Sequence, residues 1–356
     1  MRPHPVSKPS HLKLPGIEYA RGLAAVMVVF YHAARHMKLN IGYLPMGGIA
    51  QFGHAGVDFF FVLSGFIIFY IHNKDIGQPN RLPYYMQRRF TRIFPLYWTI
   101  FISQIVLSTL FSSHRLPEIS FLYQSFFLLP TVTDPYVGVA WSLQQEIIFY
   151  IIFSVVISNF KFGFFAISIW LSLIVANWLL IIPVSSNTFT TKIFLDYNIE
   201  FYFGMLAAWL TIKRLISNTL LFLAIGSVLF IGTGTAENLN LINGYTSGAR
   251  LAYGLSSFLM ILGFVGLRKI DGLIGITLNT LGTASYSIYL THLIFIGIVY
   301  KVLEFTGLFS QPPGWFIYII LSISGIIGGI FVSKFIEYPL MRFVEHFFFP
   351  KRHDRF

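Results

Sequence analysis

The chain has 356 residues, of which 55% are hydrophobic and 11% are charged, and its formal net charge is +11. Soluble domains carry roughly 25% charged residues, so this composition excludes an ordinary soluble protein and indicates an all-α, polytopic transmembrane helix bundle. The chain has no cysteine, which excludes disulfides, cysteine-ligated zinc and a thiol nucleophile. The positive charge does not indicate nucleic-acid binding, because anionic membrane lipid beside the loops already accounts for it.

Hydropathy predicts about ten spans, which we interpret as a single integral-membrane domain over 1–356. The expected spans are 17–37, 51–72, 91–112, 139–158, 162–183, 194–212, 217–233, 250–267, 279–301 and 314–337. Lys and Arg gather in alternate loops, which predicts a cytoplasmic N-terminal segment 1–16 and a cytoplasmic basic tail 338–356. The first apolar run is full-length and no convincing cleavage site follows it, so we interpret it as a span rather than a signal peptide.

The first span carries Arg21 and His32 within its apolar run. Eleven positions are about three helical turns, so both side chains share one helix face and lie about 16 Å apart. Ionisable groups at membrane depth are costly and usually face a bundle interior or a wet cavity, which favours a functional role. The structural alternative is an Arg21 that snorkels to the interface and a His32 that bonds a neighbouring helix.

A denser basic cluster precedes and enters the third span, with Arg81, Arg88, Arg89 and Arg92. Arg89 and Arg92 are three apart and share a helix face. Guanidinium forks suit phosphate oxygens, so one interpretation is an anionic, nucleotide-like donor that arrives from the cytoplasm. The equally weighted alternative is topogenic charge in contact with lipid head groups.

Polar residues also interrupt the second and fourth spans. Asp58 lies near the start of the second span, and Ser64 with Gly65 lies deeper, where two small residues favour close helix packing. Glu146 lies about two turns into the fourth span, where a carboxylate needs a partner. By depth, Glu146 and His32 fall in the same half of the bundle, so Glu146 is a candidate to hold the tautomer of His32, a contact that sequence alone does not show.

The ninth span places Tyr286, Tyr289 and His292 near mid-membrane, where Tyr289 and His292 can face one cavity. A buried histidine bonded to a backbone carbonyl fits His292 equally well. We expect His54 to be a loop residue and Glu337 to be structural, at the end of the last span. The histidines are too dispersed for a metal constellation, so we expect no metal.

Taken in order, these strings resemble the acyltransferase-3 family, the integral-membrane O-acyltransferases that decorate bacterial surface polysaccharides. The resemblance is collinear and covers nearly the whole chain. It rests on Arg21 and His32; FFFVLSGF at 59–66; Arg89 and Arg92 with Pro95 and Trp98; Trp141, Ser142, Glu146 and Tyr150; Ser285, Tyr286, Tyr289, Leu290 and His292; and Glu337 with Pro339.

The resemblance implies an acyl group, usually acetyl from acetyl-CoA, that moves from the cytoplasmic side of the bacterial inner membrane to a hydroxyl of a lipid-linked or exported glycan. Acyl-CoA is then a co-substrate, and no permanently bound cofactor is expected. His32 is implied as general base or acyl carrier, with Glu146 as its partner. The implied donor-binding residues are Arg21, Arg89 and Arg92, and the implied cavity lining is Asp58, Ser64, Trp141, Ser142, Tyr150, Tyr286, Tyr289 and His292. Lipopolysaccharide O-antigen is the first expected acceptor and exopolysaccharide the second.

Two other classes of function stay open at this point. One is a secondary transporter of a polar solute with His32 and Glu146 as a proton relay, and the other is a non-catalytic scaffold for glycan assembly. The absence of a visible internal repeat and the arginines gathered at one mouth favour the acyltransferase.

Overall fold

The computed structural model describes residues 14–111, 116–131, 133–179, 188–308 and 313–348, and these residues form helices and connecting turns without a β-strand. The helices are α1 Pro15–Ile41, α2 Gly56–His72, α3 Leu82–Phe111, α4 Ile119–Phe126, α5 Trp141–Ser158, α6 Phe160–Trp178, α7 Thr188–Ile193, α8 Tyr197–Ile212, α9 Thr219–Asn238, α10 Ser247–Val265, α11 Gly272–Phe305, α12 Gly314–Val332 and α13 Tyr338–Phe348. A 3₁₀ turn, Gln51–Ala55, precedes α2, and a π-helical turn, Ser333–Glu337, joins α12 to α13.

Each of the ten expected spans overlaps a helix, and residues 112 and 180–183, at the ends of two of these spans, lie outside the described residues. Within the described ranges, eight helical stretches are long and apolar enough to cross a membrane, and α1 and α8 correspond to the two other expected spans. The helix α8 has only 16 residues, and the apolar run of α1 is interrupted by Arg21, His32 and Arg35. The prediction of an all-α, multi-pass membrane bundle is therefore confirmed.

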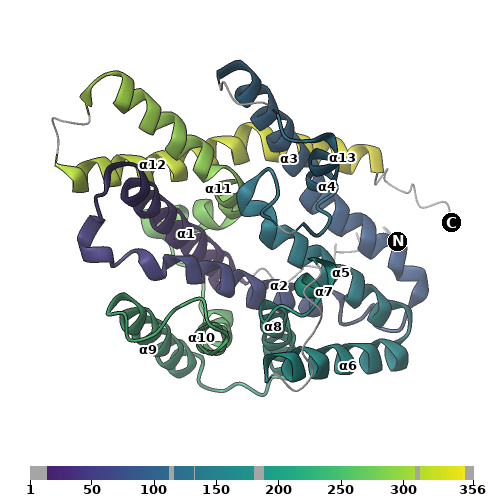
Figure 1. The fold of residues 1–356 in the computed structure, drawn as a ribbon. Coiled ribbons are helices and arrows are strands. Elements are labelled where there is room, and N and C mark those ends of the chain that lie inside the picture. The colour runs from purple at the N-terminus through teal and green to yellow at the C-terminus, as the bar shows by residue number, and fades with distance from the viewer. Residues whose placement is uncertain (1–13, 112–115, 132, 180–187, 309–312, 349–356) are drawn as a thin grey trace, which may run out of the picture.

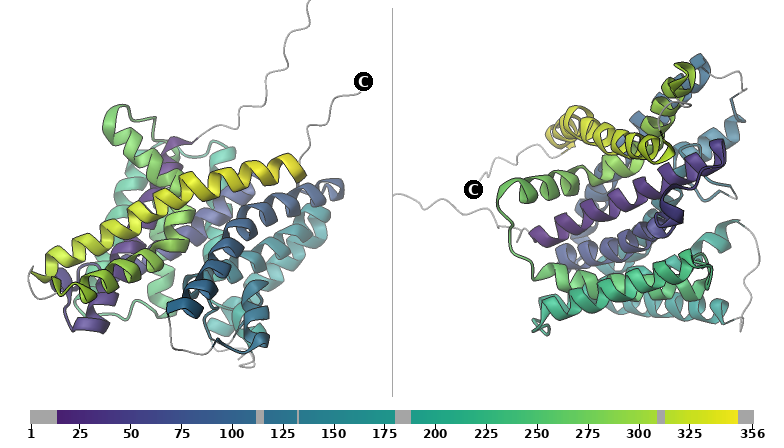
Figure 2. Two further views of the ribbon diagram at one scale, coloured as in Figure 1. Left: turned by 90° about the horizontal axis from the view of Figure 1, so that it is seen from above. Right: turned by 90° about the vertical axis from the view of Figure 1, so that its left-hand side faces the viewer.

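The first two helices lie in the middle of the bundle (Figure 1). In that view α11 and α12 lie above α1, α9 and α10 lie below it, and α3, α4 and α13 lie at the upper right. The helix α12, the π-helical turn and α13 continue one another as a long rod along one side (Figure 2). Because α1 packs against α2, α10, α11 and α12, much of its surface faces other helices rather than lipid.

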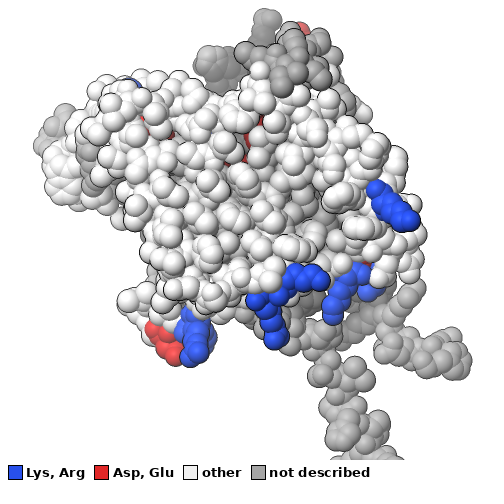
Figure 3. Space-filling view, turned by 90° about the horizontal axis from the view of Figure 1, so that it is seen from below, with Lys and Arg blue, Asp and Glu red and all other residues white. Residues whose placement is uncertain are grey.

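The face of the molecule drawn in Figure 3 is largely uncharged, as a lipid-facing surface must be. In the space-filling view most of the face is white, and most of the coloured Lys and Arg side chains lie near its lower and right-hand edges (Figure 3). Large exposed apolar side chains, such as Phe162, Phe164 and Phe165 on α6, fit this environment.

Glycines allow α2 and α8 to pack backbone to backbone. A Cβ added to Gly65 would overlap the carbonyl oxygen of Phe201, and one added to Gly204 would overlap that of Val62. This is the close packing that Gly65 predicted from sequence. Its neighbour Ser64 instead donates a hydrogen bond to the carboxylate of Glu146.

We expect Gly204→Val to destabilise the protein by about 1–3 kcal/mol, because the side chain must push α2 and α8 apart. The measurement is the thermal unfolding midpoint of detergent-solubilised protein. Gly232→Ala on α9 is the matched control, since an added Cβ meets nothing there and Ala favours a helix. Equal midpoints for Gly204→Val and wild type would contradict the close contact.

Candidate functional site

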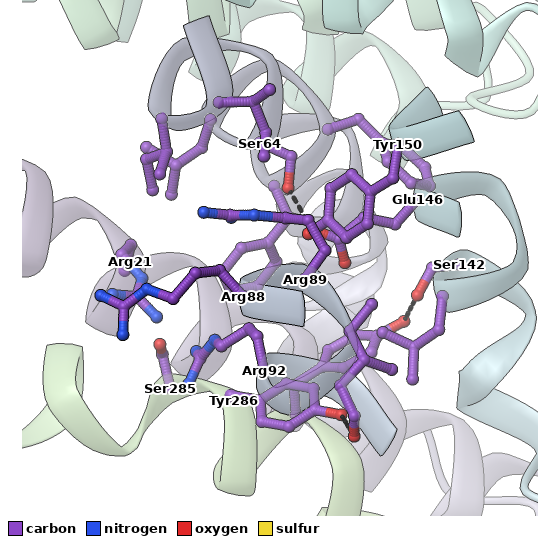
Figure 4. A pocket seen from close by; sticks show the side chains of 18 of the residues that line it. Arg21, Ser64, Arg88, Arg89, Arg92, Ser142, Glu146, Tyr150, Ser285 and Tyr286 are labelled. Atoms are coloured by element: carbon purple, nitrogen blue, oxygen red, sulfur yellow. Dashed lines mark hydrogen bonds between the residues drawn. The ribbon is translucent and has the colours of Figure 1, made fainter. Parts of the chain in front are cut away.

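The structure contains a cavity of about 370 Å³ among α1, α2, α3, α5, α11 and α13. Its lining includes nine of the residues expected from sequence, namely Arg21, Ser64, Arg89, Arg92, Ser142, Glu146, Tyr150, Tyr286 and Tyr289. Arg88 and Ser285 also line it. In Figure 4, Arg21 and Arg88 lie on one side of the cavity, and Glu146 and Tyr150 lie on the other.

Arg21 and Arg92 in the cavity lining each have a carboxylate partner. Nη1 of Arg21 lies 3.1 Å from a carboxylate oxygen of Glu18, one turn earlier on α1. Nη1 of Arg92 lies 2.9 Å from Oε1 of Glu337. Glu337 is buried and also accepts a hydrogen bond of 2.6 Å from Ser287, so it ties α3, α11 and the π-helical turn together rather than only ending a span.

Arg89 is held differently, through a histidine. Its Nη2 donates to Nε2 of His72 at 3.2 Å, and Nδ1 of His72 donates to Asp75 at 2.8 Å. Because a guanidinium has no acceptor, His72 must be the neutral tautomer with its proton on Nδ1. The Arg89 guanidinium has no direct carboxylate contact among the described residues. Its Nε is buried and has no hydrogen-bond partner there.

Glu146 lies inside the cavity, and its hydrogen-bond partners are not the ones expected. Its Oε1 accepts from the hydroxyl of Ser64 at 2.8 Å and from the hydroxyl of Tyr150 one turn along α5 (Figure 4). Within the described residues no hydrogen bond joins Glu146 to His32, so the expected dyad is not formed. Depth along two helices placed both residues in one layer, but depth does not decide which side chains face each other.

His32 and His292 lie together outside the cavity lining, with ring centroids 5.0 Å apart. His292 does not line this cavity: its ring lies against His32 on α1, whereas Tyr289, one turn earlier on α11, reaches the cavity. Nδ1 of His292 donates to the carbonyl of Ile288 at 3.1 Å, the kind of backbone bond considered from sequence. The other ring nitrogen, Nε2, is buried and has no partner in the part of the chain that the structure describes.

Two other expected lining residues also lie elsewhere. Asp58 is 1% exposed and lies 3.8 Å from Nη1 of Arg250, because its position on α2 faces α10 rather than the cavity. The ring of Trp141 packs against Phe61 and Tyr197, so it contributes to the core instead of the lining.

The neighbour of Trp141 in the chain does reach the cavity. Ser142 lines it, and its hydroxyl is 2.7 Å from the hydroxyl of Tyr289. Tyr289 also donates to the carbonyl oxygen of Val139 at 2.9 Å. The hydrogen bond between Ser142 and Tyr289 holds both side chains at one end of the cavity, and His292 lies about one turn of α11 beyond Tyr289.

Sequence reasoning missed a long-range histidine–carboxylate pair as well as the local pair of His72 and Asp75. His54, expected in a loop, is only 7% exposed, and its Nε2 lies 2.8 Å from Oε1 of Glu237. The partner is 183 positions away, so no local pattern signals the pair. Within the described ranges no group of His, Asp and Glu side chains has the arrangement of a metal site.

Comparisons with known proteins identify the family of this chain. A family model described as an acyltransferase domain, that of the acyltransferase-3 family, matches residues 14–333. The chain is 28% identical over 305 residues to the exopolysaccharide production protein ExoZ of Rhizobium meliloti, a match that covers 82% of this chain and 90% of that protein. It is 29% identical over 157 residues to the peptidoglycan O-acetyltransferase OatA of Listeria monocytogenes, which covers 39% of this chain and 23% of that protein. No solved structure matches significantly. Because the family model spans most of the sequence, the chain belongs to the acyltransferase-3 family of membrane proteins.

Proposed function

We propose that this protein is an O-acyltransferase of the bacterial inner membrane that moves an acyl group from cytoplasmic acyl-CoA to a hydroxyl of an exported or lipid-linked polysaccharide. Family membership supports the reaction class. The observation that carries the donor assignment is the arginine-lined cavity, above all Arg89, whose charge has a neutral histidine rather than a carboxylate beside it in the described part of the chain.

The chemistry of the cavity fits acyl-CoA. Phosphate oxygens prefer guanidinium donors, and the unpaired, buried Nε of Arg89 is a donor of that kind. Ligand pockets usually range from about 300 to 1,000 Å³. A cavity of about 370 Å³ therefore suits the pantetheine arm while the nucleotide stays at the cytoplasmic mouth. Acyl-CoA is consumed as a co-substrate, so the proposal includes no permanently bound cofactor.

Glu146 has a positioning role in this proposal. Its carboxylate accepts hydrogen bonds from Ser64 on α2 and Tyr150 on α5, so it fixes two hydroxyls that line the donor cavity. It therefore acts on the shape of the cavity rather than on the proton of the acceptor.

His32 is the proposed base in the transfer. The acceptor hydroxyl oxygen forms a bond to the thioester carbonyl carbon, the carbon–sulfur bond breaks, and the hydroxyl proton passes through His32 to the leaving thiolate. The ring of His292 neighbours the ring of His32, with centroids 5.0 Å apart, and the ring of Tyr289, with centroids 6.2 Å apart, and Tyr289 lines the cavity.

The names of the two relatives support a polysaccharide acceptor. One is named for exopolysaccharide production and the other as an O-acetyltransferase of peptidoglycan. Acetyl is accordingly the proposed acyl group. The relative that matches along most of this chain favours exopolysaccharide over the O-antigen that sequence alone ranks first.

The test of this proposal is ester-linked acetate on cell-surface polysaccharide, measured by NMR in cells that lack the gene and in complemented cells. We expect acetate to be lost with the gene and restored by wild type. Membranes supplied with labelled acetyl-CoA and de-O-acetylated polysaccharide should then form labelled ester. A transporter or a scaffold would form none, so absence of ester on every surface polymer tested would overturn the assignment.

A further inference from the structure

A second group of polar side chains lies at the other end of the bundle from Arg88 and Arg89, which form the basic mouth of the cavity. We call it the outer cluster and define it as Tyr31, His54, Glu237 and Tyr245. They come from α1, the 3₁₀ turn before α2, the end of α9 and the loop between α9 and α10. That loop joins two spans, so it lies outside the hydrocarbon. The helix α2 has 17 residues. At 1.5 Å per residue it separates His54 from the loop that follows α2 by about 25 Å.

A carboxylate holds the ring of His54 in one orientation. Oε1 of Glu237 accepts from Nε2 of His54 at 2.8 Å, and Oε2 accepts from the hydroxyl of Tyr253 at 2.6 Å. With its proton on Nε2, the neutral imidazole presents Nδ1 as an acceptor. Among the described residues Nδ1 has no hydrogen-bond partner, so His54 has one oriented acceptor left for a ligand hydroxyl.

Tyr245 adds an exposed aromatic surface to this acceptor. Its ring stacks on His54 with centroids 4.4 Å apart and an interplanar angle of 20°, yet 52% of the residue is exposed. Its hydroxyl lies 2.7 Å from the hydroxyl of Tyr31, and only one of the two donates in that bond. The other phenol keeps a proton for a ligand, because each hydroxyl carries one donor.

The proposed base lies beside the outer cluster. The ring of Tyr31 meets the ring of His32 edge-on at 4.8 Å and that of His54 edge-on at 5.7 Å. A molecule held by Tyr31, His54 and Tyr245 is therefore a near neighbour of His32. The exposed Arg35 lies one turn beyond Tyr31 on the same face of α1.

We propose that the outer cluster is the binding subsite for the acceptor sugar, an inference that rests on the proposed acyltransferase function. The apolar face of a sugar ring packs on Tyr245, one sugar hydroxyl donates to Nδ1 of His54, and another accepts from a phenol of Tyr31 or Tyr245. An aromatic surface with a few oriented polar groups is the usual form of a site for a small neutral ligand. Donor and acceptor thus enter from opposite ends of the bundle and meet near His32.

The test uses full-length protein in proteoliposomes, with acetyl-CoA and oligosaccharides prepared from the host's de-O-acetylated polysaccharide. For Tyr245→Ala and His54→Asn we expect the KM for the oligosaccharide to rise about tenfold, with kcat and the KM for acetyl-CoA unchanged. His36→Asn is the matched control. His36 lies further along α1, and its ring also packs edge-on against a tyrosine, Tyr300. A purely structural pair would lower stability and kcat while the acceptor KM stays constant, and that result would overturn the subsite.

Binding without turnover separates this inference from the function on which it rests. In the absence of acetyl-CoA, the oligosaccharide should raise the thermal midpoint of wild type and of His36→Asn but not of Tyr245→Ala. Such a shift without any ester formation would retain the subsite and overturn the acyltransferase assignment. If ester forms but the oligosaccharide raises the thermal midpoint of Tyr245→Ala as much as that of wild type, the acyltransferase assignment stands and the subsite is overturned.

Discussion

We expect the His32→Ala protein to lose acetylation of the polysaccharide by a factor of about 10² to 10⁴, the range that general acid–base catalysis contributes. The physical reason is the position of the imidazole, half-buried beside His292 on one side and Tyr31 of the outer cluster on the other. The measurement is ester-linked acetate per sugar repeat, at equal amounts of protein in the membrane. The KM for acetyl-CoA of any residual activity should be unchanged, because His32 does not line the cavity proposed for the donor.

A matched control separates chemistry from folding. His36 lies one turn beyond His32 on α1 and packs against Tyr300, so His36→Ala removes a partly buried imidazole from the same helix. We expect near wild-type acetylation from that variant. Acetylation by His32→Ala within a few-fold of wild type would show that another group takes the hydroxyl proton.

The helices of this protein were predictable because a membrane span is a local property of the sequence. Each needs about 20 apolar residues whatever its neighbours are, so hydropathy alone located the expected spans. Even α1, which carries Arg21 and His32, was recognisable, because most of its other residues are apolar. The packing of α2 on α8 followed in part from Gly65, although nothing in the sequence identified Gly204 as its counterpart.

The site was predictable only as far as a helix face can be read from spacing. Spacing placed Arg89 and Arg92 on one helix face, and the structure brings both to one cavity, which Glu146 also lines. The partner of each group was not predictable, since it depends on which helix lies opposite. Asp58 faces Arg250 on α10, an arrangement that is fixed only when the helices pack.

His54 also shows that the partner of an ionisable group is not predictable from local sequence. As one histidine in a short glycine-containing connection, it carried no local signal of function, and its partner Glu237 lies far along the chain. The expected pair between His32 and Glu146 is not formed among the described residues, whereas His54 pairs with Glu237 and His72 with Asp75. Long-range pairing of ionisable groups is the part of a membrane site that hydropathy and spacing leave undetermined.

Replacement of Arg89 by Ala is expected to raise the KM for acetyl-CoA by about 10- to 100-fold, because a hydrogen bond to a charged group contributes about 1.5–3 kcal/mol. Arg89→Lys should recover part of this loss, since it restores the charge but not the planar fork that binds two phosphate oxygens. The measurement is initial rate against acetyl-CoA concentration in membranes, with saturating polysaccharide.

Arg81 provides the matched control for Arg89. It lies in the turn before α3, its side chain is 54% exposed, and it pairs with Asp75, the same carboxylate that holds His72. Arg81→Ala removes one positive charge near the basic mouth without altering the cavity lining, so we expect its KM for acetyl-CoA to stay near wild type. Equal rises in both variants would assign the effect to net charge at the membrane surface, and the donor phosphates would then bind elsewhere. A rise in the KM for acetyl-CoA that is confined to Arg89→Ala would indicate direct contact between Arg89 and the donor, because Arg89 lines the cavity and Arg81 does not.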